Sequence, residues 1–225
     1  MDIELVVFDM AGTTLNDDDG VNRCLRAALE PLGVRATRDA VNSVMGIPKP
    51  EALRQLITRY ERPGLLPEIA AIHEDFVRRM IEFYRTDPSV REIAGAEATF
   101  RRLHAGGIKV ALDTGFTRDI VQVVLDRLGW NDTELVDATV TSDEVERGRP
   151  HADMIEKAMR DLGVKDARRV AKVGDTPADL EQGTASGCGL VIGVTAGSHT
   201  AHELKPFAHT HLIRTVAELP ALLGL

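Results

Sequence analysis

The chain has 225 residues, 44% of them hydrophobic and 28% charged, and a formal net charge of −8 at pH 7. Such an acidic chain is a poor partner for nucleic acid, whose phosphates repel it, although local groups can still bind a small anionic substrate. Its N-terminal segment carries acids and only a short apolar run, so we expect a cytoplasmic protein with neither a signal peptide nor a membrane span.

Near-continuous apolar runs predict buried strands along the chain. The first run is LVVFD at residues 5–9, and further runs follow at 109–114, 137–142, 169–175, 189–194 and 211–215. Helical patterns lie between them at 96–105, 117–129, 151–163 and 177–186. Strands that alternate with helices predict right-handed βαβ units, and therefore an α/β fold with a doubly wound parallel sheet.

Residues 16–90 interrupt this alternation with an all-helical pattern. Helices are predicted at 20–33, 38–45, 51–61 and 67–86, with prolines between them, and no strand is expected in this interval. We therefore expect a core domain formed by residues 1–15 and 91–225, and an inserted helical cap domain formed by residues 16–90. Because the insert follows the first strand, it should cover the edge of the sheet where that strand ends.

Carboxylates stand where the predicted strands end. Asp9 ends the first strand, and the motif GDTPAD, with Asp175 and Asp179, ends the strand at 169–175. Ligands of open parallel sheets bind at this edge, so the three side chains should meet there. Clustered carboxylates repel one another, and a hard cation such as Mg²⁺ is the usual remedy. The cation would also neutralise a phosphoryl group and leave one aspartate free to attack phosphorus.

Two other motifs suit a phosphoryl ligand. The hydroxyl of Thr114 and the backbone amide of Gly115 begin a strand-to-helix turn, which can hold a phosphate oxygen, although such turns are also common without a ligand. Arg149 can hold the phosphoryl oxygens together with the attacking carboxylate, unless it is a surface residue. Lys172 is a weaker candidate for this role, because it lies inside a predicted strand and can point away from the site.

The motifs FDMAGTT, DTG, GRP and GDTPAD, in this order and spacing, resemble the haloacid dehalogenase (HAD) superfamily with a C1-type cap. The resemblance extends over the whole chain and implies a Rossmann-like core and an aspartyl-phosphate mechanism. It implies that Asp9 is the nucleophile and that Mg²⁺ is held by Asp9, the backbone carbonyl of Ala11, Asp175 and Asp179. The residues implied to contact the substrate are Ala11, Gly12, Thr13, Met45, Gly46, Thr114, Gly115 and Arg149.

Ala11 stands where most phosphatases of the superfamily have an acid that protonates the leaving oxygen. General acid–base catalysis contributes about 10²–10⁴-fold, so ester hydrolysis should suffer from its loss. The phosphonatase branch has the same alanine, and it cleaves a carbon–phosphorus bond with a lysine Schiff base as electron sink. Lys49, preceded by Met45 and Gly46, matches the lysine of that branch. Burial and the N-terminus of the helix expected at Pro50 should favour its neutral amine.

The resemblance therefore implies a Mg²⁺-dependent hydrolase for phosphonoacetaldehyde or a related oxo-phosphonate, with Lys49 as a catalytic residue and a homodimer formed through the cap. The sequence departs from that branch at Met10, Ala52 and Asp19, where an aromatic residue, a histidine and a cysteine are usual. These departures leave the particular substrate open. One alternative is a phosphatase for a small phosphomonoester or anhydride, with Lys49 as a simple contact. Another is a catalytically silent sensor, against which the retained aspartates argue.

Overall fold

The computed structural model describes residues 2–131 and 134–225, so Met1 and residues 132–133 of the predicted core domain lie outside the described residues. A central sheet of six parallel strands has the order β5-β4-β1-β6-β7-β8. Its strands are β1 (Leu5–Asp9), β4 (Lys109–Thr114), β5 (Ala138–Thr141), β6 (Val170–Gly174), β7 (Leu190–Val194) and β8 (His211–Ile213). The chain winds outward from β1 in both directions, which confirms the predicted doubly wound sheet.

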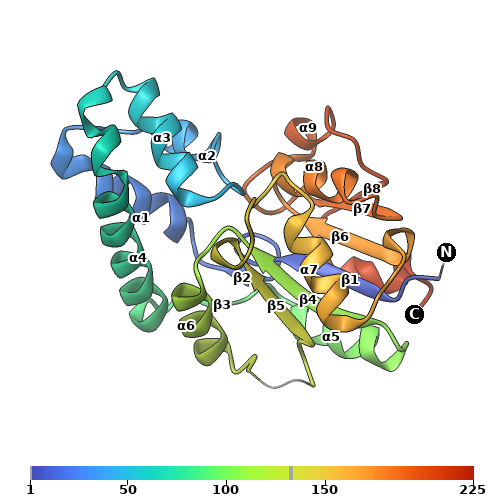
Figure 1. Cartoon of the computed structure of the whole chain (residues 1–225). Helices are drawn as coiled ribbons and strands as arrows, with labels where there is room; N and C mark the ends of the chain where they lie inside the picture. Colours follow the sequence, from blue (N-terminus) through green and yellow to red (C-terminus); the bar gives the residue numbers. More distant parts are fainter. Residues whose placement is uncertain (1, 132–133) are drawn as a thin grey trace.

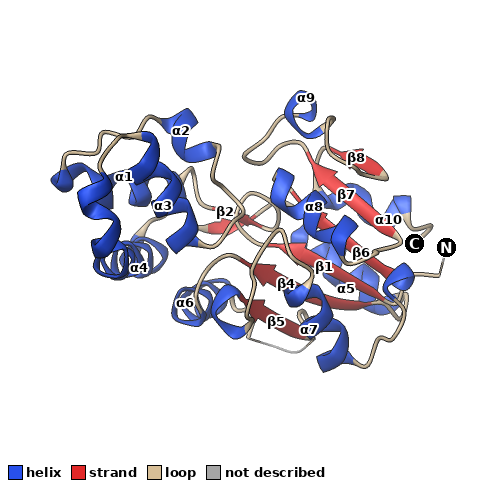
Figure 2. Cartoon of the chain, turned by 45° about the horizontal axis from the view of Figure 1, so that its top comes forward, coloured by secondary structure: helices blue, strands red, loops and turns tan. Residues whose placement is uncertain are grey.

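Helices cover both faces of the sheet (Figure 2). Successive residues of a strand point to opposite faces, so Val6 and Phe8 pack on one side while Leu5 and Val7 pack on the other. The first face carries α5 (Ala96–Ala105), α6 (Arg118–Leu128) and α10 (Leu219–Leu222), and the second carries α7 (Asp153–Leu162), α8 (Pro177–Ala185) and α9 (Ala201–Leu204). The short helices α9 and α10 were not predicted, because four residues are too few to show a helical period.

Residues 20–86, hereafter the helical insert, form a lobe beside the sheet, at the end far from the chain termini (Figure 1). They comprise α1 (Gly20–Leu29), α2 (Arg38–Asn42), α3 (Lys49–Arg59) and α4 (Ile69–Thr86). The first predicted helix ends early, at Leu29, because Pro31 cannot donate a backbone hydrogen bond and the chain continues as a 3-10 turn. Helix α2 is also shorter than predicted, and α3 begins two residues earlier, at Lys49.

A short antiparallel pair joins the two connections of the helical insert. Contrary to the prediction of no strand in 16–90, Asn16 belongs to β2 (Leu15–Asn16), which pairs with β3 (Arg91–Glu92). The Asn16 side chain also donates a hydrogen bond of 3.1 Å to the carbonyl of Ser89. Strands of two residues carry no readable apolar pattern, but this pair holds the entrance and exit of the insert together.

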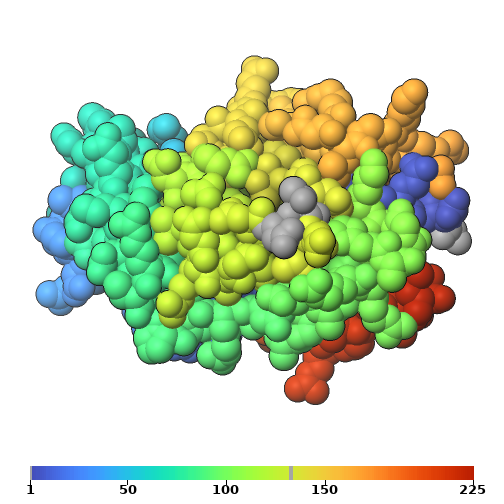
Figure 3. Space-filling view, turned by 90° about the horizontal axis from the view of Figure 1, so that it is seen from below, coloured from blue at the N-terminus to red at the C-terminus, as the bar shows by residue number. Residues whose placement is uncertain are grey.

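The helical insert packs closely on the carboxyl edge of the sheet. Helix α4 lies against α6, and the two surfaces are seen side by side in Figure 3. The Tyr84 ring of the insert meets the Phe116 ring of the core edge to face, with centroids 5.9 Å apart. A Cβ atom on Gly148 would lie only 2.5 Å from Pro48, so a loop of the insert touches the core there. In the part of the chain that is described, no helix is both long and apolar enough to be a membrane span.

Candidate active site

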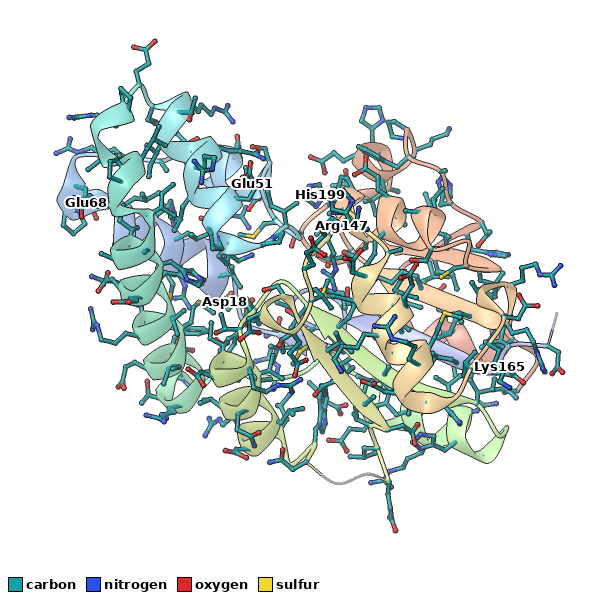
Figure 4. All side chains as sticks on the ribbon, viewed as in Figure 1. Asp18, Glu51, Glu68, Arg147, Lys165 and His199 are labelled. Atoms are coloured by element: carbon teal, nitrogen blue, oxygen red, sulfur yellow. The ribbon has the colours of Figure 1, made fainter. Side chains whose placement is uncertain are left out.

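The strand ends bring the predicted residues to one place. Strands β4, β1 and β6 are neighbours, and they end in Thr114, in Asp9 and just before Asp175. The labelled Asp18, Arg147 and His199 mark the junction of the helical insert with this carboxyl edge in Figure 4. The site therefore lies between the sheet and the insert.

Three buried aspartates form the centre of the site. Oxygens of Asp9, Asp175 and Asp179 all lie within 4.8 Å of one another. Asp175 accepts hydrogen bonds from the Thr13 hydroxyl at 3.1 Å and from the Ser198 amide at 2.6 Å, which fixes its orientation. Burial raises the pKa of Asp9, and the neighbouring carboxylates raise it further against the opposing effect of a nearby arginine. A bound cation would stabilise the ionised form of these clustered carboxylates.

Arg149 joins the strand ends through its guanidinium. It donates to Asp9 at 2.6 Å and to the backbone carbonyl of Asp113 at 2.8 Å, and it lies 3.1 Å from Asp179. Lys172 also points into this cluster, with its ammonium in contact with Asp113 and 3.0 Å from Asp179. Lys172, the weaker candidate of the sequence, therefore points into the site, because its long aliphatic stem reaches from the middle of β6 to the two carboxylates that compensate its burial.

The charges of this cluster do not balance. Its buried carboxylates are those of Asp9, Asp113, Asp175 and Asp179, and its buried cations are Arg149 and Lys172. Four negative charges against two positive charges leave a formal surplus of two. Burying unpaired charge is costly, and a divalent cation on an oxygen donor set would remove that cost. The residues present therefore fit a hard divalent ion.

Glycines allow the backbone to close around Asp175. Gly12 has φ +91°, and a Cβ atom there would lie 2.4 Å from an oxygen of Asp175. A Cβ atom on Gly197 would approach the same carboxylate equally closely. A larger residue at either position would force the Asp175 side chain to shift, and at Gly12 it would also have to adopt a left-handed backbone conformation. Gly12 thus permits both the turn after β1 and the close approach of Asp175 to the backbone.

The turn after β4 lies where core and insert meet. The Thr114 hydroxyl accepts a hydrogen bond of 3.2 Å from the amide of Phe116, which shapes the turn into α6. A Cβ atom on Gly115 would lie 3.0 Å from the carbonyl oxygen of Ile47, in the insert. Gly115 therefore permits a close approach of the insert as well as access to its own backbone amide.

A cavity of about 210 Å³ lies between the insert and the carboxyl edge. Seven of the eight residues predicted to contact substrate line it, and they are Ala11, Gly12, Met45, Gly46, Thr114, Gly115 and Arg149. The predicted catalytic residues Asp9 and Lys49 line it as well. Thr13 does not line this cavity, since its buried hydroxyl donates to Asp175. The cavity thus brings Asp9 and the lysine of the insert together.

Lys49 is almost fully enclosed, with 4% of its surface exposed. Its amine donates to the carbonyl of Ile47 at 3.3 Å and lies 5.7 Å from the centroid of the Phe116 ring. Burial lowers the pKa of Lys49 to about 8, helped by the positive charge of Arg149 and opposed by Asp9. A usable fraction of the amine is therefore neutral near physiological pH.

Asp17 is a buried carboxylate in the cavity wall that was not among the residues predicted from the sequence. One of its oxygens accepts hydrogen bonds from the Tyr84 hydroxyl at 3.1 Å and from the Val21 amide at 3.3 Å. Burial raises the pKa of Asp17 to about 6, although both hydrogen bonds oppose the shift. Its place in the run DDD suggests a solvated turn, so only its long-range contact with Tyr84 distinguishes it from its neighbours.

Known proteins resemble this chain over most of its length. The haloacid dehalogenase-like hydrolase family matches residues 6–193. A phosphonoacetaldehyde hydrolase of Bacillus cereus is 31% identical over 219 residues, covering 91% of this chain and 82% of that protein. A phosphonoacetaldehyde hydrolase of Bacteroides fragilis is 28% identical over 260 residues, covering 99% of this chain and 96% of that protein.

Solved structures show the same fold. A phosphonoacetaldehyde hydrolase-like protein from Oleispira antarctica superposes with a TM-score of 0.88 at 20% identity, covering 100% of this chain and 92% of that one. A predicted phosphoglycolate phosphatase from Haemophilus somnus superposes with a TM-score of 0.83 at 18% identity, covering 99% of each chain. The chain therefore belongs to the haloacid dehalogenase-like hydrolase family, in its phosphonatase-like branch.

Proposed function

We propose that this protein is a Mg²⁺-dependent hydrolase that cleaves the carbon–phosphorus bond of phosphonoacetaldehyde or a closely related oxo-phosphonate. The observation that carries the proposal is the enclosed Lys49 amine, which shares one cavity with Asp9. Ala11 lines the same cavity at the position where an ester phosphatase needs an acid. Relatives named phosphonoacetaldehyde hydrolase support the same reaction class.

Asp9 is the nucleophile that attacks phosphorus in this proposal. The guanidinium of Arg149, 2.6 Å from an oxygen of Asp9, orients that carboxylate and faces the phosphoryl oxygens. Thr114 and Gly115 bind the remaining phosphoryl oxygens at the turn before α6. Mg²⁺, held by Asp9, Asp175, Asp179 and the carbonyl of Ala11, would neutralise charge on the phosphoryl group.

Lys49 handles the leaving group. Its neutral amine condenses with the aldehyde of the substrate to form an imine, which accepts the electron pair of the breaking carbon–phosphorus bond and becomes an enamine. No oxygen leaves with that electron pair, so the acid that Ala11 replaces is not required. Close packing of the insert near Gly115 and Gly148 keeps water from the imine while the bond breaks.

The proposal is tested with phosphonoacetaldehyde and sodium borohydride. We expect Mg²⁺-dependent release of phosphate, and a reduced adduct that mass spectrometry assigns to Lys49. Lys49→Arg keeps the charge but should lose at least about 10²-fold in turnover and all of the adduct, because guanidinium is a poor nucleophile. The matched control is Lys157→Arg, a change in an exposed pair with Asp161 that should leave turnover unaltered. Phosphate release from esters alone, with no adduct, contradicts the proposal.

A second candidate is a phosphatase for a small phosphomonoester or anhydride whose leaving group needs no acid. It is favoured by the hydrogen bond between the Lys49 amine and the Ile47 carbonyl, which suits a lysine that only contacts its substrate. The borohydride experiment separates the two candidates, since a phosphatase forms no adduct on Lys49.

A further inference from the structure

We infer that Asp17 is a further catalytic residue, the group that carries a proton between the Lys49 amine and the carbonyl oxygen of the substrate while the imine forms. The inference rests on the proposed function, because it concerns the same cavity and the same imine. It assigns to Asp17 a proton transfer that Ala11, which lines the same cavity, cannot perform.

The geometry of Asp17 leaves one carboxylate oxygen available. Its other oxygen accepts from both Tyr84 and Val21, so the side chain is held in place on that side. Within residues 2–131 and 134–225, no hydrogen bond to the first oxygen, Oδ1, is formed. The residue is only 8% exposed, and what it faces is the cavity that Lys49 also lines. This oxygen is accessible from the cavity, so a hydrogen-bond donor on a bound substrate can reach it.

Aromatic packing connects Asp17 to Lys49. Tyr84 is fully buried in α4 and packs edge to face on Phe116, with the ring centroids 5.9 Å apart. The Lys49 amine lies 5.7 Å from the centroid of the same Phe116 ring. The Tyr84 hydroxyl that holds Asp17 is therefore part of the same packed unit as the lysine. Any shift of the insert that moves Lys49 away from the core also disturbs Tyr84.

The proposed proton transfers balance. The Asp17 carboxylate takes a proton from the Lys49 ammonium, and the neutral amine adds to the carbonyl carbon. One proton of the attacking nitrogen moves to the carbonyl oxygen, which gives a neutral carbinolamine. The protonated Asp17 then donates its proton to this hydroxyl, the carbon–oxygen bond breaks, and water leaves. The products are the iminium on Lys49, one water molecule and the original Asp17 carboxylate.

The ionisation states agree with this cycle. Burial raises the pKa of Asp17 to about 6, opposed by Tyr84 and Val21, while burial lowers that of Lys49 to about 8. Between these values the carboxylate is ionised and the amine is protonated, so the pair holds the one proton that the cycle moves. The other charged or titratable groups around the pair are Asp9, Asp18, Asp19, Cys24, Arg38, His73, Tyr84, Arg149 and Asp175. We therefore expect a bell-shaped profile of kcat/KM, with limbs near these two pKa values.

Asp17→Asn is the decisive variant, because asparagine keeps the size of the side chain and can still accept from Tyr84. With phosphonoacetaldehyde at pH 7 we expect a loss in kcat/KM, and in the rate of borohydride-trapped adduct, of about 10²–10⁴-fold. The rate of the variant should depend on the free amine alone and rise with pH, with the limb below the wild-type Lys49 pKa, because the Asp17 charge that raises this pKa is gone. Circular dichroism and thermal unfolding check that its fold is intact.

Tyr84→Phe tests the positioning role of the tyrosine. Its hydroxyl lowers the pKa of Asp17, so its removal should raise that pKa and move the acid limb of the profile to higher pH. A purely structural role would reduce the rate equally at every pH. The control is Asp39→Asn, which neutralises an exposed carboxylate of the insert outside the cavity and should leave the profile unchanged.

The outcomes separate this inference from the proposed function. Suppose that the wild-type protein forms the Lys49 adduct and that Asp17→Asn forms it at the same rate and with the same pH profile. The role of Asp17 is then overturned, and the phosphonatase proposal stands. If the wild-type protein itself forms no adduct and releases no phosphate from the aldehyde phosphonate, the proposed function falls and the role of Asp17 falls with it.

Discussion

Gly46 offers a test of whether activity needs the helical insert closed on the core. It has φ +83°, and a Cβ atom there would lie 2.3 Å from the hydroxyl oxygen of Thr176 and 3.1 Å from the Cβ of Ala178. Both neighbours belong to the core, at the start of α8. Gly46→Ala therefore creates an overlap that exists only while the insert and the core are packed together.

The expected magnitude follows from two separate costs. Alanine in the left-handed region costs about 1–2 kcal/mol, and this strain is the same whether the insert is closed or open. Overpacking typically costs a further 1–3 kcal/mol or so, and here that cost falls on the closed arrangement alone. Because about 1.4 kcal/mol corresponds to a tenfold change, the ratio of closed to open molecules should fall by about 5- to 150-fold. We expect kcat/KM to fall by up to the same factor, which is reached once the open form predominates.

The assay measures kcat/KM for phosphate release from phosphonoacetaldehyde, beside thermal unfolding. The matched control is Gly107→Ala, since Gly107 has φ +75° and a Cβ atom there would have no neighbour within 4 Å. It carries the backbone strain without the overlap, so it should lower the unfolding temperature and leave kcat/KM near the wild-type value. Equal kcat/KM for the two variants would refute the reasoning that the contact between Gly46 and Thr176 limits closure.

Two further predictions concern the metal and the missing acid. Asp175→Asn removes one charge from the acidic cluster. Calorimetry should show loss of Mg²⁺ binding, and turnover should fall at least about 10²-fold, while the unfolding temperature is kept or raised. Undiminished activity of the wild-type protein in chelator would contradict the metal site. Ala11→Asp should lower turnover of the aldehyde phosphonate, because the new carboxylate crowds the lysine adduct and adds charge beside the cation. A large gain in the turnover of a phosphate ester as the native substrate would instead favour the phosphatase proposal.

Residue order alone determined the architecture and the core side of the site. Apolar runs separated by helical periods specify a parallel sheet, and the carboxyl ends of such strands share one edge, so Asp9, Thr114 and Asp175 had to lie near one another. The helical character of the insert was also readable. The ends of its helices were predicted less accurately, since Pro31 and the contacts around Lys49 decide them locally. The pair β2–β3 could not be predicted, because a strand of two residues is too short to show an alternating apolar pattern.

Only the tertiary structure decided which polar side chains are enclosed. Lys172 lies in an apolar strand, and its direction depends on the carboxylates of Asp113 and Asp179, which come from other parts of the chain. Asp17 is chemically identical to the two aspartates that follow it, and what separates them is burial against Tyr84, 67 positions away. Local sequence specifies backbone preference and apolar period, whereas desolvation and its effect on pKa depend on neighbours that only folding brings together.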